Sequence, residues 1–124
     1  MLYKIMLYVF GVLSVMGAVL STNKFTTPEN LKIAPDFVGL AALFGAAMLA
    51  TAIMSFIMAS AKDPKIRIMV SSATIVWLVL NVGAHYANVS RGIEGSLLTP
   101  IVFSGLLITG FVISMLAERK KLNL

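Results

Sequence analysis

Long apolar stretches, separated by short polar segments, run through the whole chain. Residues 5–23, 37–61, 68–90 and 95–117 contain no lysine, arginine, aspartate or glutamate. Each stretch is about as long as the roughly 20 residues that an α-helix needs to cross a hydrocarbon core of about 30 Å. The pattern therefore predicts an all-α membrane protein, folded as an up-down four-helix transmembrane bundle.

The prolines indicate where these helices begin. Three of them follow a residue whose side chain can cap a helix, at Thr27-Pro28, Asp63-Pro64 and Thr99-Pro100. Proline is tolerated at the first helical position because its missing N–H would have no partner within the helix. We predict spans at 4–21, 37–61, 66–89 and 99–117 within one integral membrane domain, 1–124, and a short interfacial turn over 28–33.

Composition narrows the class of protein further. Of the 124 residues, 59% are hydrophobic and 12% are charged, which is more apolar surface than a small soluble core could bury. The chain has no cysteine, so disulfides, thiolate metal sites and thiol catalysis are excluded. No paired acids, activated nucleophile or phosphate-binding loop is recognisable. We therefore expect no enzymatic activity, no cofactor and no resident metal.

Lysine and arginine are unevenly shared between the two sides of this bundle. One side would hold Lys4, the second connection and the C-terminal tail, with Lys62, Lys65, Arg67, Arg119, Lys120 and Lys121. The other side would hold Lys24, Lys32 and Arg91. The positive-inside rule then predicts cytoplasmic termini in a plasma or inner membrane. The six basic residues of the connection and the tail favour anionic lipid headgroups, rather than nucleic acid, as partners.

The first stretch also has features of a secretory signal. A basic residue, Lys4, precedes an apolar run that ends near Ser21. The run is slightly long for a signal, and its cleavage motif is weak. We expect a retained first helix.

The third stretch carries polar residues at membrane depth. With Leu78 they alternate three and four apart, which places them on one face of a helix, as Ser71, Thr74, Asn81, His85 and Asn88. Polar groups are unfavourable against lipid, so this polar seam should face the bundle. It would either bond to hydroxyls of neighbouring helices, at Ser14, Thr51, Ser55 or Ser104, or line an outward-facing polar cavity. In that cavity Asp36, which begins the second span on the same side, would pair with His85.

Small residues predict where the helices approach one another, because close backbone contact drives association in lipid. Three stretches carry them at helical spacing: Gly11, Ser14, Ala18 and Ser21; Ala47, Thr51, Ser55 and Ala59; and Gly105 and Thr109. These patterns favour a non-enzymatic membrane protein that acts through helix–helix contacts, as a scaffold, an accessory subunit or a homo-oligomer. The alternative is a channel or transporter component that uses the cavity around Asn81, His85 and Asn88. A membrane enzyme or redox subunit is a third and weaker interpretation.

Overall fold

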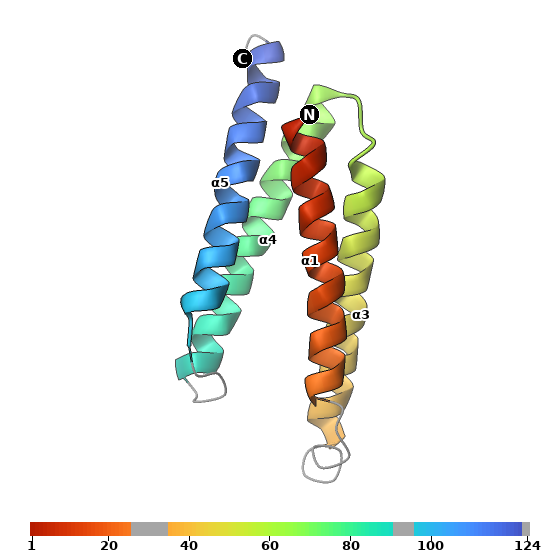
Figure 1. Cartoon of the computed structure of the whole chain (residues 1–124), viewed down its shortest axis with the longest axis vertical. Coiled ribbons are helices and arrows are strands. Elements are labelled where there is room, and N and C mark those ends of the chain that lie inside the picture. The colour runs from red at the N-terminus through yellow and green to blue at the C-terminus, as the bar shows by residue number, and fades with distance from the viewer. Residues whose placement is uncertain (26–34, 91–95, 123–124) are drawn as a thin grey trace. The chain divides into compact units, whose positions relative to one another are not determined.

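A computed structural model describes residues 1–25, 35–90 and 96–122, apart from the side chains of 21–25, 35–41 and 88. This part of the chain forms four helices: α1 (Leu2–Phe25), α3 (Pro35–Met58), α4 (Pro64–Ser90) and α5 (Leu98–Lys121) (Figure 1). The prediction of an all-helical fold with four long helices is confirmed. The turn predicted over 28–33 lies outside the described residues.

Asp63-Pro64 marks a helix start as predicted, Thr99-Pro100 does not, and Thr27-Pro28 lies outside the described residues. α3 begins at Pro35 and α4 at Pro64, where the Asp63 Oδ1 accepts a hydrogen bond of 2.8 Å from the Lys65 N–H. α5 begins at Leu98, and its N–H donates to the Ser96 Oγ at 3.1 Å. Thr99 is therefore not the cap, and Pro100 is the third helical residue. Proline is tolerated there because the first four N–H groups of a helix have no intrahelical partner.

The described chain divides into two compact units. Unit 1 comprises residues 1–6 and 61–124, and unit 2 comprises residues 7–60. α1 contributes its first turn to unit 1 and the rest of its length to unit 2. Each unit therefore contains two long helical segments, which are described separately below.

In unit 2, α1 and α3 pack side by side in antiparallel directions. The rings of Tyr8 and Phe56 lie 5.9 Å apart, centroid to centroid. A Cβ atom at Gly11 would lie 2.5 Å from the Phe56 ring, and one at Gly17 would lie 2.8 Å from the Met48 Cε. Because positions farther along α1 meet positions farther back along α3, the helices run in opposite directions. Gly11 and Gly17 allow this close approach.

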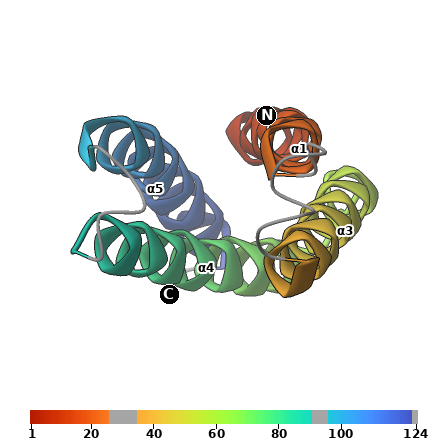
Figure 2. The same cartoon turned by 90° about the horizontal axis from the view of Figure 1, so that it is seen from below.

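In unit 1, α4 and α5 also lie side by side and antiparallel (Figures 1 and 2). The Arg67 Nη1 lies 3.1 Å from the Glu118 Oε1, and the Ser72 Oγ donates to the Met115 Sδ at 3.3 Å. Residues 1–6 pack on this pair, since a Cβ at Gly110 would collide with the Met6 side chain. Gly110, which the sequence did not single out, is thus the glycine of close approach in α5.

The buried positions of the helices follow a spacing of three and four residues. On α1 they include Tyr3, Leu7, Phe10, Ser14 and Ala18; on α3 they include Ala52 and Ser55, followed by Ala59 just after the helix ends. The predicted four-residue stripe on α3 is only half right, because Ala47 is exposed. A strict four-residue repeat drifts by about 40° per step around a helix of 3.6 residues per turn, so it leaves the buried face. Gly105 and Thr109 are exposed too, so they are not packing positions between the described helices of unit 1.

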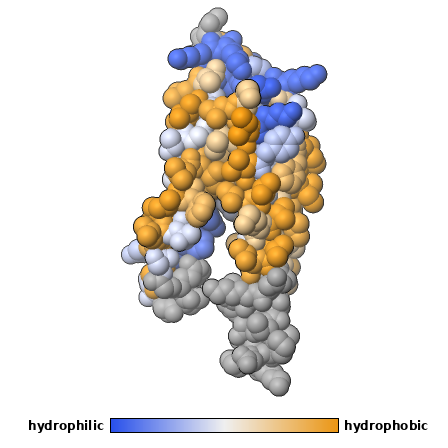
Figure 3. Space-filling model, viewed as in Figure 1, coloured by the Kyte–Doolittle hydropathy of each residue, from blue (hydrophilic) through white to orange (hydrophobic). Residues whose placement is uncertain are grey.

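Three helices are long and apolar enough to cross a membrane, over Leu2–Leu20, Pro64–Ala87 and Leu98–Lys121. Within the described side chains of α3, the apolar stretch Ala42–Met58 is shorter than these. Large aliphatic side chains cover much of the exposed surface, whereas strongly hydrophilic ones gather at one end of unit 1 (Figure 3). Length and composition therefore support membrane insertion for three helices.

Candidate functional site

The polar seam of α4 becomes less buried along its length. Ser71 and Thr74 are buried together with Leu78, whereas Asn81 and His85 are half-buried. The side chains of Asn88 and Asp36 lie outside the described residues, so the predicted Asp36–His85 pair stays a prediction. The best-defined part of the seam is therefore its first half, nearest the start of α4.

Two of the four hydroxyl groups named as cross-helix partners donate within their own helix, and hydrogen bonds from the seam to any of the four stay a prediction. Thr51 donates to the Ala47 carbonyl at 2.8 Å, and Ser55 donates to the Thr51 carbonyl at 2.7 Å. Within the seam itself, Thr74 donates to the Val70 carbonyl at 2.8 Å. Each of these hydroxyl groups therefore donates its proton to a carbonyl one turn earlier on its own helix, not to a neighbouring helix.

α5 carries a matching buried stripe, which was not predicted from the sequence. Its members again alternate three and four apart: Ser104, Leu107, Phe111, Ser114 and Glu118. Arg67 pairs with Glu118, and both helices rise about 1.5 Å per residue in opposite directions. Ser71 and Ser114 should therefore lie at one level, and Leu78 and Leu107 at another. The same three-and-four spacing could have predicted this stripe. It is harder to recognise than the α4 seam, because its leucine and phenylalanine do not differ from the surrounding apolar residues.

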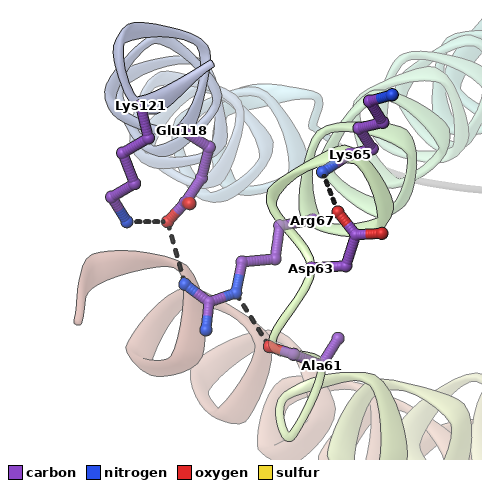
Figure 4. A network of polar contacts seen from close by, with 6 residues as sticks. All are labelled: Ala61, Asp63, Lys65, Arg67, Glu118 and Lys121. Carbon is purple, nitrogen blue, oxygen red and sulfur yellow. Dashed lines mark hydrogen bonds and ion pairs between the residues drawn. The ribbon is translucent and has the colours of Figure 1, made fainter.

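An ion-pair network lies next to the seam, at the start of α4 (Figure 4). The Glu118 Oε1 lies 3.1 Å from the Arg67 Nη1 and 2.8 Å from the Lys121 Nζ. The Arg67 Nε donates to the Ala61 carbonyl at 2.8 Å, which ties the α3–α4 connection to the same network. The Glu118 side chain is only 4% exposed, so bulk water contributes little to solvating its charge. The two cations must do so instead.

The first turn of α1 completes this network. The Arg67 guanidinium lies 5.5 Å from the centroid of the Tyr3 ring, and Tyr3 is buried. A guanidinium within about 6 Å of an aromatic ring is attracted by the ring's negative face. Tyr3 therefore belongs to the interior of unit 1 rather than to a membrane-interface belt. Arg67 thus joins the N-terminal segment, the start of α4 and the end of α5, and we call these groups the Arg67 network.

The residues predicted to bind lipid headgroups surround this network. Lys62, Lys65, Arg119, Lys120 and Lys121 are exposed, whereas Arg67 is half-buried and directed into the network. Headgroup binding stays a prediction for all six residues. Glu118 does not stand out in the sequence, because three basic residues follow it directly. Nothing in that local pattern distinguishes a buried glutamate from an exposed one.

The described residues contain no group of three or more histidine, cysteine, aspartate or glutamate side chains that could hold a metal ion. The polar groups that they do bring together are a buried ion pair at one end of unit 1 and half-buried Asn81 and His85 toward the other. The chain matches no protein-family model, no curated protein and no solved structure among those with which it was compared.

Proposed function

We propose that this chain is an integral membrane protein of four spans that acts through helix–helix contacts, as a scaffold, an accessory subunit or a homo-oligomer. Its distribution of side chains supports insertion. Small or polar residues such as Ser14, Ser71 and Ser114 are buried, while Leu43, Leu80 and Leu106 are each more than 60% exposed. Water would favour the reverse arrangement, whereas lipid solvates leucine and leaves small residues to mediate close packing.

The charges support one orientation. Every charged side chain among the described residues belongs to unit 1, in segments 1–6, 61–67 and 118–121. The Arg67 network links these three segments, so they share one end of the unit. They carry seven of the ten lysine and arginine residues. The positive-inside rule then favours the cytoplasm for this end, and with it both chain termini.

The observation that carries the proposal is a small-residue surface on α5 that the described residues of unit 1 leave uncovered. Gly105 and Thr109 lie one turn apart and are exposed. A Cβ at Gly105 would meet no atom within 4 Å. Glycine at such a surface lets a second helix approach closely in lipid. We therefore assign Gly105 and Thr109 to a contact with another polypeptide, either a second copy or a different membrane protein.

Replacing Gly105 tests this assignment without disturbing the fold. Gly105→Ile should keep the helical circular-dichroism spectrum, because the position has open space, but it should reduce the mass of the complex extracted in mild detergent. Native mass spectrometry would measure that mass. Gly83→Ile on α4 is the matched control, since a Cβ there also meets nothing within 4 Å. An undiminished complex for Gly105→Ile would contradict the assignment.

A channel or transporter component is the second candidate. Asn81 and His85 favour it, because they continue the line of the buried seam yet keep partial exposure. Under this proposal, His85→Ala should change the rate or the pH dependence of proton entry into vesicles loaded with a pH-sensitive dye, with the complex intact. Under the scaffold proposal, His85→Ala should lower stability or assembly and leave the vesicles equally tight.

A further inference from the structure

Three buried oxygen atoms in unit 1 have no hydrogen-bond partner: the Oγ atoms of Ser71 and Ser114 and the Oε2 of Glu118. All three residues are at most 3% exposed. Burying a polar group without a partner is unfavourable by about 1–3 kcal/mol for a neutral group and by more for a charged one. Such atoms in a native interior are usually satisfied by ordered water.

The three atoms belong to one short section of the α4–α5 interface. Ser114 lies one turn before Glu118 on the buried stripe of α5, and Ser71 lies one turn after Arg67 on that of α4. Because Arg67 contacts Glu118 and the helices are antiparallel, the two serines lie at the same level, about 6 Å along the axis from the ion pair. Both contacts of Glu118 converge on Oε1, which leaves Oε2 free for another donor (Figure 4).

The surroundings of these atoms favour a small neutral ligand. Arg67 and Lys121 already neutralise Glu118, so a further cation would be repelled, and the free carboxylate oxygen would repel an anion. A water molecule can donate to Oε2 and exchange hydrogen bonds with both hydroxyl groups.

We propose that α4 and α5 hold an internal water site, bounded by Ser71, Ser114 and Glu118. Beyond it lie Phe111 and Thr74, whose hydroxyl already donates to the Val70 carbonyl, and then the buried Leu78 and Leu107, which form an apolar layer. The bound water therefore stops at this layer and does not reach Asn81 or His85. The proposal stands independently of the proposed function, because it concerns only the interior of unit 1.

Solid-state NMR of the unmodified, carbon-13-labelled protein in lipid bilayers tests the site directly. Magnetisation transferred from water protons should reach the Ser71 and Ser114 Cβ atoms several-fold faster than the methyl groups of Leu78 and Leu107. Ser55 is the matched control, since it is buried but its hydroxyl donates to the Thr51 carbonyl. If Ser71 and Ser114 receive magnetisation as slowly as Ser55, their hydroxyl groups are dry and the proposal is overturned.

A substitution shows whether the two serines share the water. In Ser114→Ala, transfer to the Ser71 Cβ should fall to the rate of Ser55, because the water loses one of its partners. Unchanged chemical shifts of Leu78 and Leu107 would show that the helices remain packed. If transfer to Ser71 stays as fast as in the unmodified protein, the serines do not share a water and the site as proposed is wrong.

Discussion

Glu118 is the residue whose role differs most from what its neighbours in the sequence suggest. It precedes Arg119, Lys120 and Lys121, yet its side chain is buried between α4 and α5 while Arg119 and Lys120 are exposed. A helix explains the difference, because consecutive residues point about 100° apart. Glu118 continues the buried stripe of Ser114 and Phe111, so its face, not its local composition, determines its environment.

Removing Arg67 should therefore destabilise the protein more than removing an exposed cation. Arg67→Met leaves a buried carboxylate with Lys121 as its only cation. We expect the free energy of unfolding to fall by about 3 kcal/mol, near the lower end for a broken buried pair. Unfolding titrations in mixed detergent micelles, followed by circular dichroism, would measure the change.

Two further variants separate this effect from a general loss of charge. Lys120→Met, at an exposed position, should change the free energy of unfolding by less than about 0.5 kcal/mol. The double variant Arg67→Met/Glu118→Met should recover much of the lost stability, because it leaves no buried charge unpaired. A double variant less stable than Arg67→Met alone would show that Glu118 does not depend on Arg67.

At the scale of the helices, packing depends on which face a small residue occupies. Gly11 and Gly110 lie where a neighbouring side chain touches the backbone, whereas Gly83 and Gly105 lie where nothing does. The sequence marks all four equally as small residues in apolar stretches. It could predict the helices, and the buried positions of Ser71 and Thr74 at the start of the seam, because hydrophobic length and polar spacing are local properties. It could not rank the glycines, because their contacts depend on the register between two helices.

One added methyl group should therefore change the free energy of unfolding in opposite directions at Gly11 and at Gly83. Gly11→Ala places a Cβ 2.5 Å from the Phe56 ring and should lower the free energy of unfolding by about 1–3 kcal/mol through overpacking. Gly83→Ala meets no atom within 4 Å and should raise it by up to about 1 kcal/mol, because alanine favours the helix.

The same detergent titration compares the two alanine variants. The sign of each change matters more than its size, since the unfolded state is equally affected by both. If Gly11→Ala were as stabilising as Gly83→Ala, the close approach of α1 and α3 in unit 2 would be wrong.

At the scale of the whole chain, the charges are segregated. Segments 1–6, 61–67 and 118–121 carry seven basic and two acidic residues, a net charge of +5. The remaining sequence carries three of each sign and is neutral. The count of lysine and arginine residues in each connection and terminus predicted this basic side. It could not predict that Arg67 would join the three segments, because that contact brings together residues far apart in the chain.

The central claim is that lipid contacts the aliphatic face of α4 while its seam is turned away from the acyl chains. The chain has no cysteine, so single cysteines can carry a nitroxide at chosen positions of α4 without a background signal. Electron paramagnetic resonance in bilayers then measures collision of each label with dissolved oxygen, which concentrates in the acyl region. The account predicts frequent collision at Val76 and Leu80, which are exposed, and little at Thr74 and Leu78, which are buried. Equal collision at all four positions, or more at Thr74 and Leu78, would contradict it.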